Sequence, residues 1–349
     1  TTVDSDGRTL QYPPLVASAQ AGFRAVEVML HVSGPLTHLV AGSHTNTATA
    51  AALSIVSGET LGGPYSGSYL SLNSNDIRVE DAVTVTSTSL AAASSAGMLV
   101  FAQDGPLRSP SCSGNQLTAS GDGMRLESNA TLAATVLGLV VHLGDVRRVL
   151  YMTFISVDST QFDFAGNDAT LVANAQLAVA TLGIAVRAPQ ANRRYSTYFS
   201  SYSTRIMFSG DGNTIIAADG SGRPTGGNAA SVLGIAASVL GDVDRVRLMY
   251  TDIAVSGQHL IVQTGTSFSA SSIMGIAIFS TGGDQTTSQY GGDTFDIDYS
   301  TCSFSGNHSI ISSGGSVLSI SVSIINIRGR PGENDISIND AMFSATGNN

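Results

Sequence analysis

A short apolar phrase with a small residue at its centre recurs about every 44 residues along the 349-residue chain. Its copies are 52–56, 96–100, 136–140, 181–185, 232–236, 273–277 and 317–321, with centres at Ser54, Met98, Gly138, Gly183, Gly234, Gly275 and Ser319. Self-similarity at a period of about 20–50 residues is typical of stacked repeat architectures. The pattern therefore predicts one structural unit that is repeated through most of the chain.

A second phrase recurs with nearly the same period. It consists of an apolar residue, a small residue and then Gly-Asn or a related pair, as in Phe304-Ser305-Gly306-Asn307. We anchor its copies on Gly34, Ser74, Gly114, Gly166, Gly210, Gly257 and Gly306. Because Gly and Asn both tolerate positive φ, this phrase predicts a tight turn between two strands.

The repeat unit has the pattern of β-structure. In residues 243–284, short apolar runs rich in Val and Ile alternate with Ser/Thr/Gly clusters, which is typical of strands and turns. The alternative is helix, because residues 130–142 and 169–186 are rich in Ala and Leu. Gly inside nearly every apolar phrase and the scarcity of Glu and Lys argue against helices.

These features predict an all-β chain that forms a parallel β-helix, or β-solenoid, of about seven repeats of about 44 residues. We expect three strands per coil, although two smaller coils per repeat are also compatible with the period. Parallel crossovers are right-handed as a rule, so we expect a right-handed coil. A propeller of WD type has a similar period, but the chain has no Trp and lacks the markers of that repeat.

The repeat divides the chain into two parts. Residues 1–20 stand outside it and are expected to form an N-terminal arm or entry segment, and residues 21–349 form the solenoid. Residues 343–349 resemble the start of an eighth Gly-Asn phrase, so we expect the solenoid to be truncated within that repeat. The expected partners are further copies or neighbouring solenoid segments stacked at the chain ends.

Composition narrows the setting. The net charge is −10, yet only 12% of residues are charged, and all 16 basic residues are Arg. The surface must therefore consist largely of Ser, Thr, Asn, Gln and Gly, which favours an extracellular wall or coat, at a cell or flagellar surface. A nucleic-acid partner is not expected without a basic patch. No apolar run reaches the length of a membrane span.

Candidate chemistry is sparse. Cys112 and Cys302 lie several repeats apart, so we expect two buried, unpaired thiols, with intermolecular pairing as the alternative. Asn129 and Asn307 fit the N-glycosylation pattern. Asp293, Asp296 and Asp298 form the densest acidic group, and they are weak candidates for Ca²⁺ binding or acid–base work beside the simpler prediction of a solvated acidic face.

The six His residues show no metal-ligand spacing, and no nucleophile motif, phosphate-binding loop or CxxC pair occurs. No catalytic residue and no cofactor is therefore expected. The glycines of the two phrases, Gly138, Gly183, Gly234 and Gly275 with Gly166, Gly210, Gly257 and Gly306, are expected to be structural positions of the repeat.

The phrases Val243-Asp244-Arg245-Val246-Arg247-Leu248 and Ile253-Ala254-Val255-Ser256-Gly257, together with the recurring Ser-Val-Leu-Gly-Ile-Ala, are similar to repeats of the large dispersed-gene-family surface proteins of trypanosomes and their relatives. The similarity covers most of residues 21–349 and lies in their low charge, their richness in Ser, Ala, Val and Gly, and the lengths of the repeated phrases. It implies a β-helical, glycosylated, adhesin-like protein at a cell surface, and no catalytic residues.

The leading functional hypothesis is a non-enzymatic extracellular structural or adhesive protein, a solenoid segment of a filament, flagellar hair or surface coat. The alternative is a β-helical carbohydrate-active protein that binds or cleaves a polysaccharide along its flank, with glycans as partners. A third possibility is a fibre of phage or viral type.

Overall fold

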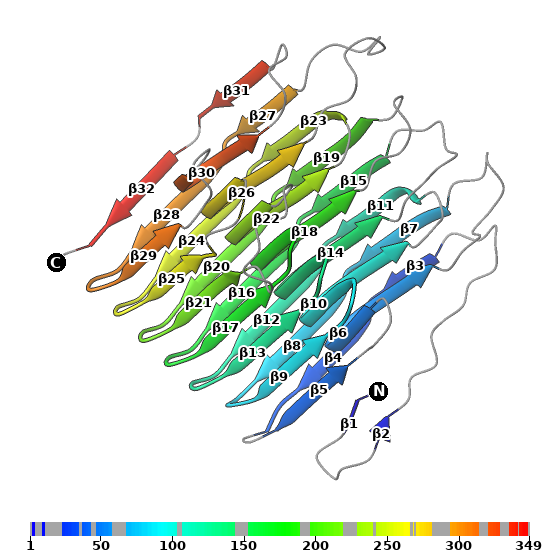
Figure 1. Ribbon diagram of the computed structural model, residues 1–349, viewed down its shortest axis with the longest axis vertical. Coiled ribbons are helices and arrows are strands. Elements are labelled where there is room, and N and C mark those ends of the chain that lie inside the picture. Colours follow the sequence, from blue (N-terminus) through cyan, green and yellow to red (C-terminus); the bar gives the residue numbers. More distant parts are fainter. Residues whose placement is uncertain are drawn as a thin grey trace.

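The computed structural model shows a parallel β-solenoid in which successive coils are stacked from the N-terminal to the C-terminal side (Figure 1). It describes residues 2–3, 9–10, 23–34, 37–42, 47–57, 68–102, 107–143, 153–188, 196–218, 229–239, 242–265, 268, 270–280, 294–313, 320–328, 335–340 and 342–347. Within these ranges the chain forms strands and turns and no helix. The prediction of an all-β parallel solenoid is confirmed, and the helical alternative for residues 130–142 and 169–186 is excluded, because these residues lie in strands and their turns.

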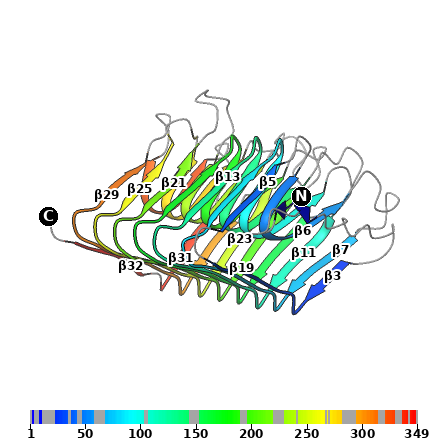
Figure 2. The same ribbon diagram turned by 90° about the horizontal axis from the view of Figure 1, so that it is seen from below.

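Every fourth strand pairs in parallel, so the solenoid has four sheets that run along its length (Figure 2). Sheet I contains β3 (Phe23–Val26), β7 (Ser68–Asn73), β11 (Leu107–Ser113), β15 (Thr153–Asp158), β19 (Ser196–Tyr202), β23 (Asp242–Met249), β27 (Thr294–Asp298) and β31 (Asp335–Asn339). Sheet II contains β4 (Met29–Val32), β8 (Asp76–Glu80), β12 (Gln116–Ser120), β16 (Gln161–Ala165), β20 (Arg205–Ser209), β24 (Asp252–Ser256), β28 (Thr301–Ser305) and β32 (Met342–Thr346).

Sheet III contains β5 (His38–Gly42), β9 (Thr84–Thr88), β13 (Arg125–Asn129), β17 (Thr170–Asn174), β21 (Thr214–Ala218), β25 (Ile261–Thr264) and β29 (Ile310–Ser313). Sheet IV contains the longest strands: β6 (Thr47–Ser57), β10 (Ala92–Ala102), β14 (Ala133–Leu143), β18 (Ala178–Ala188), β22 (Ala229–Val239), β26 (Ala270–Ser280) and β30 (Ile320–Arg328). Separately, β1 (Thr2–Val3) and β2 (Thr9–Leu10) form an antiparallel pair in the segment expected to be an N-terminal arm.

Each coil therefore has four strands, and the expectation of three is wrong. The missed corner lies between sheets I and II, where only two residues separate the strands. Between β23 and β24 these residues are Tyr250 and Thr251, and Tyr250 makes the turn with a φ of 52°. With neither Gly nor Asn between β23 and β24, the sequence carries no turn signal there, and the Gly114-Asn115 pair at the same corner of an earlier coil is spaced like a copy of the second phrase.

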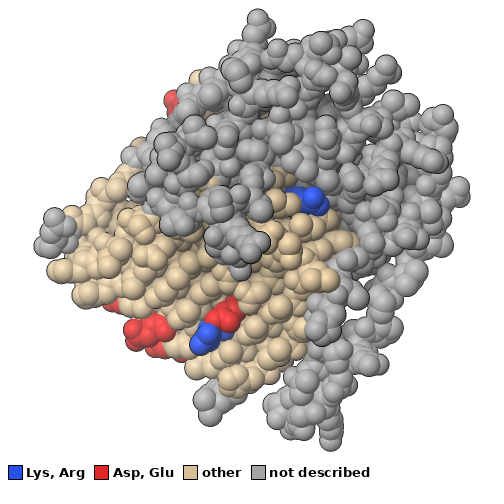
Figure 3. Space-filling model, in the orientation of Figure 1, with Lys and Arg blue, Asp and Glu red and all other residues tan. Residues whose placement is uncertain are grey.

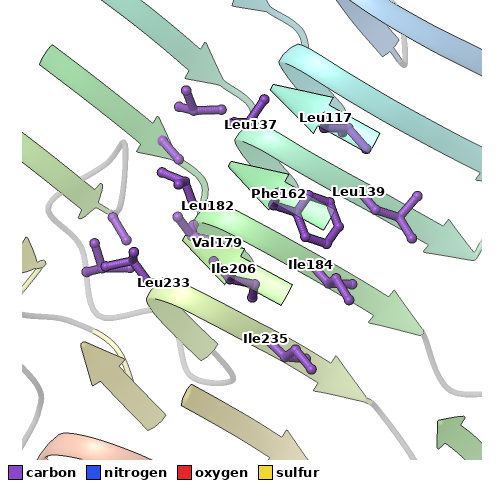
Figure 4. Close-up of a cluster of buried hydrophobic side chains, with 14 of the residues drawn as sticks. Leu117, Leu137, Leu139, Phe162, Val179, Leu182, Ile184, Ile206, Leu233 and Ile235 are labelled. Carbon is purple, nitrogen blue, oxygen red and sulfur yellow. The ribbon is translucent and has the colours of Figure 1, made fainter. Parts of the chain in front are cut away.

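The interior is filled by rows of aliphatic side chains at equivalent positions of successive coils. Leu137, Leu182 and Leu233 form one such row, because their strands pair in that register. Phe162 and Ile206 of sheet II face the row from across the interior, and all five side chains are fully buried (Figure 4). In-register stacking thus packs equivalent aliphatic side chains of successive coils against each other. It also pairs the backbone groups between coils.

The central glycine of the first phrase marks a bend in each sheet IV strand. The pairing leaves out the residue two positions before the glycine, which is Val136 in β14, and Val136, Leu137 and Leu139 all reach the interior core. Gly97, Gly138, Gly183, Gly234 and Gly275 follow one another in register. A Cβ on any of the first four would lie about 2 Å from the carbonyl oxygen of the next, between 1.9 and 2.1 Å. Close backbone approach is therefore the reason for glycine here.

Three of the seven expected centres of this phrase are displaced. The position of Gly138 is occupied by Gly97 rather than Met98 in β10 and by Ala52 rather than Ser54 in β6. In β30 it is occupied by Ile324, and the expected centre Ser319 lies outside the described residues. Apolar residues fill both faces of sheet IV, since the side chains on its outer face are buried as well. Without alternation, the sequence could not fix the register of these copies.

The second phrase marks the corner between sheets II and III. Gly121, Gly166, Gly210, Gly257, Gly306 and Gly347 form a second row, in which a Cβ on each of the last five would lie within 2.2 Å of the preceding glycine's carbonyl oxygen. The expected anchors Ser74 and Gly114 instead lie at the corner between sheets I and II, and the equivalent residues are Asp81 and Gly121. Ser74 and Gly114 are 40 residues apart, and so are Asp81 and Gly121. Spacing alone therefore could not distinguish one corner from the other.

Candidate functional site: side-chain rows along two corners

The outer surface of the described coils is low in charge. The strands of sheets II and III alternate buried and partly exposed residues, and the outward side chains are mostly short and polar. Figure 3 shows only a few Arg, Asp and Glu side chains on the described part of one face. The ion pairs of His31 with Glu80, Arg78 with Asp76, and Arg125 with Glu127 are exposed and contribute little to stability.

The corner between sheets II and III carries a row of side chains that each bind the next coil. The backbone N–H of Asn167 donates to Asp122 Oδ1 at 2.7 Å, that of Asp211 to Asn167 Oδ1 at 2.9 Å, and that of Gln258 to Asp211 Oδ1 at 2.7 Å. Each exposed turn therefore holds its neighbour through the same hydrogen bond. This repetition makes the corner a continuous polar edge.

The corner between sheets I and II has a buried polar row beneath it. Asn115 Oδ1 accepts hydrogen bonds from the backbone N–H of Asn75 at 3.1 Å and from its Nδ2 at 2.8 Å. Asn115 Nδ2 donates to the carbonyl oxygen of Leu72 at 2.9 Å. The equivalent positions in later coils are Thr160, Thr204, Thr251 and Ser300, and they are also buried. The hydroxyls of Thr160, Thr204 and Ser300 donate to the backbone carbonyl oxygens of Asp158, Val157 and Asp298, whereas the Thr251 hydroxyl is buried without a partner among the described residues.

Above this buried row lies a row of exposed tyrosines. Tyr202, Tyr250 and Tyr299 are 45%, 46% and 50% exposed. The ring centroids of Tyr202 and Tyr250 are 5.3 Å apart in an edge-to-face arrangement, and those of Tyr250 and Tyr299 are 5.1 Å apart and stacked. Tyr250 and Tyr299 have positive φ, at positions where earlier coils have Ser74, Ser159 and Ser203. A bulky residue is unfavourable in that conformation, so the turn itself does not require tyrosine at these positions.

A pair of histidines lies at the corner between sheets II and III. The imidazole rings of His259 and His308 are stacked, with centroids 5.3 Å apart and planes at 12°. Both residues have positive φ and both are exposed. This pair could not be found from the sequence, because its members are 49 residues apart and become neighbours only through coil stacking.

Two of the three predicted acidic residues lie on the same face of one strand. Asp296 and Asp298 lie on the outer face of β27, as their alternation in a strand predicts, while Asp293 lies outside the described residues. Asn339 Nδ2 of the next coil donates to Asp298 Oδ1 at 2.9 Å, and Asp296 pairs in register with Arg247. Among the residues that the structure describes, no three or more His, Cys, Asp or Glu side chains are grouped to hold a metal ion.

The two glycosylation candidates lie in different settings. Asn129 ends β13, is half-buried, and its Oδ1 accepts a hydrogen bond from Asn174 Nδ2 at 2.6 Å. Asn307 lies in the turn after Gly306, where its carbonyl oxygen accepts from the backbone N–H of His259 at 2.9 Å. Use of Asn129 as an acceptor would require the side chain to leave this partner, and Asn307 is likewise only partly exposed.

The two cysteines are free and buried, as predicted. Cys112 lies in β11 and Cys302 in β28. Burial raises the pKa of each thiol to about 12, with a smaller effect from the carboxylates of Asp158 and Asp252 respectively. Both cysteines are therefore unreactive core residues in the folded chain.

A buried histidine lies on the outer face of sheet IV. The ring of His142 stacks on that of Phe101 with centroids 4.7 Å apart, and its Nε2 lies 3.5 Å from Arg187 Nη1. Burial, with a further contribution from the Arg187 charge, lowers the pKa of His142 from 6.5 to about 3. The imidazole is therefore neutral across the physiological pH range.

None of the described residues belongs to a helix long and apolar enough to cross a membrane. Comparison with known proteins gave no matching family model, no matching curated protein and no matching solved structure.

Proposed function

We propose that this chain is a non-enzymatic structural or adhesive segment of an extracellular surface, whose stacked coils supply length and a repeating polar side wall. The observation that carries the proposal is the row Asp122, Asn167, Asp211 and Gln258, in which each turn binds the next through the same kind of hydrogen bond. Each added coil gains the same hydrogen bond, so this interaction stabilises a longer stack and does not form a single pocket. The surface-protein resemblance and the low content of charged residues, 12%, support an extracellular setting.

The proposed partners are neighbouring solenoid segments that stack on the outermost described strands. In β32, the N–H of Met342 donates to Ser300 O and the carbonyl oxygen of Thr346 accepts from Gly306 N, both at 3.0 Å. In a parallel strand, alternate residues bond to opposite sides, so Phe343 and Ala345 direct their backbone groups away from β28. These groups match the pairing that a further strand in the same register would use.

The test is end-to-end association of the purified chain. We expect rods in negative-stain electron microscopy and an average mass that increases with concentration in light scattering. Ala345→Pro removes one outward N–H without disturbing the pairing with β28, so it should reduce association, while Ala345→Val should not. A chain that stays monomeric at all concentrations, or that associates equally well as Ala345→Pro, would contradict the stacking proposal.

The tyrosine row favours a second function, the binding of a polysaccharide along the corner between sheets I and II. Exposed aromatic rings with polar tips suit sugar rings, which have apolar C–H faces and hydroxyl edges. Tyr250→Ser and Tyr299→Ser introduce the residue that the same position has in Ser159 and Ser203, so the fold should tolerate them. Glycan binding is supported if the parent chain is retained on immobilised polysaccharides and the two variants are not. It is rejected if the variants are retained as well as the parent chain, or if the parent chain is not retained.

A further inference from the structure

We propose that His259 and His308 form a surface binding site for a divalent transition-metal ion such as Zn²⁺. The two imidazoles come from equivalent turn positions of adjacent coils, since the N–H of His259 donates to the carbonyl oxygen of Asn307 at 2.9 Å. Their rings are parallel within 12° and 5.3 Å apart between centroids. Neutral imidazole nitrogen is a preferred ligand of Zn²⁺, Cu²⁺ and Ni²⁺.

The ring nitrogens of both residues are available. Among the described residues, neither ring takes part in a hydrogen bond or an ion pair, and both side chains are exposed. One ion with Zn–N distances of about 2.0–2.1 Å requires the two ligating nitrogens to lie within roughly 4 Å of each other. A modest rotation of the two exposed rings can bring one nitrogen of each within this separation. Metal binding should therefore unstack the two rings.

The surroundings favour a cation. Along the same row of turn positions, Asp168 and Gly212 precede His259 in the two previous coils. Asp168 Oδ1 lies 2.3 Å from the place where a Gly212 Cβ would be, so the carboxylate fills the space of the missing side chain. Asp211 lies on the same corner, with its Oδ1 on the backbone N–H of Gln258 at 2.7 Å. Asp211 and Asp168, one and two coils away from His259, contribute negative potential along this corner.

The donor set defines the kind of site. No described group of three or more His, Cys, Asp or Glu side chains is placed to hold an ion, so the carboxylates act through charge and the two imidazoles are the protein ligands. A tetrahedral Zn²⁺ would then retain two positions for water or for a ligand from another molecule. The site is therefore open, and it differs from the closed sites that stabilise folds.

The test is titration of the whole chain with Zn²⁺ by calorimetry at pH 7.5 in a non-chelating buffer. His259→Asn and His308→Asn keep a residue that tolerates positive φ, so the turns should persist, which circular dichroism can check. Each variant should weaken binding at least about tenfold, because the second imidazole no longer acts at high effective concentration. The exposed His38, which lies on β5, provides a matched control, and His38→Asn should leave the affinity unchanged.

Two further outcomes separate the imidazole pair from other sources of binding. Mg²⁺ prefers oxygen ligands, so it should give no binding that depends on either histidine. The ring signals of His259 and His308 should shift together in NMR spectra on addition of Zn²⁺. Zn²⁺ binding that survives either replacement, or that Mg²⁺ reproduces, would overturn the proposal.

Discussion

A Cβ on Gly183 would lie 2.1 Å from the carbonyl oxygen of Gly234 in the next coil. Gly183 also has a φ of 120°, a conformation that other residues rarely adopt. The two glycines therefore let sheet IV bend without separating adjacent coils. The same relationship recurs along the row, so the first repeated phrase of the sequence records a backbone contact rather than a binding site.

Gly183→Ala should lower the free energy of unfolding by about 2–4 kcal/mol, because overpacking and backbone strain both oppose it. Gly42→Ala is the matched control, since nothing lies within 4 Å of a Cβ there and its backbone is unstrained. Chemical denaturation of the two variants measures the difference. Equal stability of the two would contradict the close packing assigned to the glycine row.

Asn115→Ala should be strongly destabilising, because it removes both acceptor and donor from the buried turn of the previous coil. The backbone N–H of Asn75 and the carbonyl oxygen of Leu72 would be left without their partners. The expected loss is about 2–3 kcal/mol in denaturant unfolding. Asn167→Ala removes a hydrogen bond of the same type at an exposed turn, and it should cost less than about 1 kcal/mol. A cost for Asn167→Ala as large as that for Asn115→Ala would show that burial does not set the effect.

The sequence supported part of this architecture and left other parts undetermined. The strands, their parallel stacking and the glycines Gly166, Gly210, Gly257 and Gly306 followed from periodicity and turn chemistry. The fourth strand was missed because Tyr250 and Thr251 occupy its turn without Gly or Asn, and because the Gly114-Asn115 pair at the same corner is spaced like a copy of the second phrase. Turn preferences describe averages, and a stacked backbone can hold an unfavourable residue in place.

The rows of side chains were harder to predict than the strands. The intervals between successive copies vary, so residues that stack, such as His259 and His308, cannot be paired by adding a fixed number. Asp122 and Asn167 illustrate the same difficulty, because their hydrogen bond depends on the correct copy of the Gly-Asn phrase. Register is fixed by the buried face of each strand, and sheet IV is buried on both faces.

His142 should make the folded chain sensitive to acid. Its folded pKa of about 3 lies below the ordinary value of 6.5, so the neutral form contributes stability that is fully present above pH 6.5. As the pH falls from 6.5 toward 3, the unfolded chain binds a proton that the folded chain does not. The expected loss is about 1.4 kcal/mol per pH unit.

The measurement compares urea unfolding of the parent chain and of His142→Gln between pH 7 and pH 4. Other titrating groups affect both chains alike, so the difference isolates His142. The parent chain should lose about 2 kcal/mol more than the variant by pH 5. Parallel pH profiles would show that the pKa of His142 is the same in the folded and unfolded chains.

The central claim is that residues one repeat apart are direct neighbours in a four-sheet stack. Thr170 and Thr214 pair in register on sheet III, and Ile261 follows Thr214 in the next coil. Adjacent strands place paired Cα atoms about 4.8 Å apart, within the range of a disulfide, whereas two coils span about 9–10 Å.

The most direct test is oxidation of the double variant Thr170→Cys/Thr214→Cys, with Thr170→Cys/Ile261→Cys as the control. Mass spectrometry after digestion should find the 170–214 disulfide in nearly all molecules and little or no 170–261 disulfide. The buried Cys112 and Cys302 should not interfere, because neither thiol is accessible in the folded chain. Failure of the 170–214 pair to cross-link, or equal cross-linking of both pairs, would contradict the register of the solenoid.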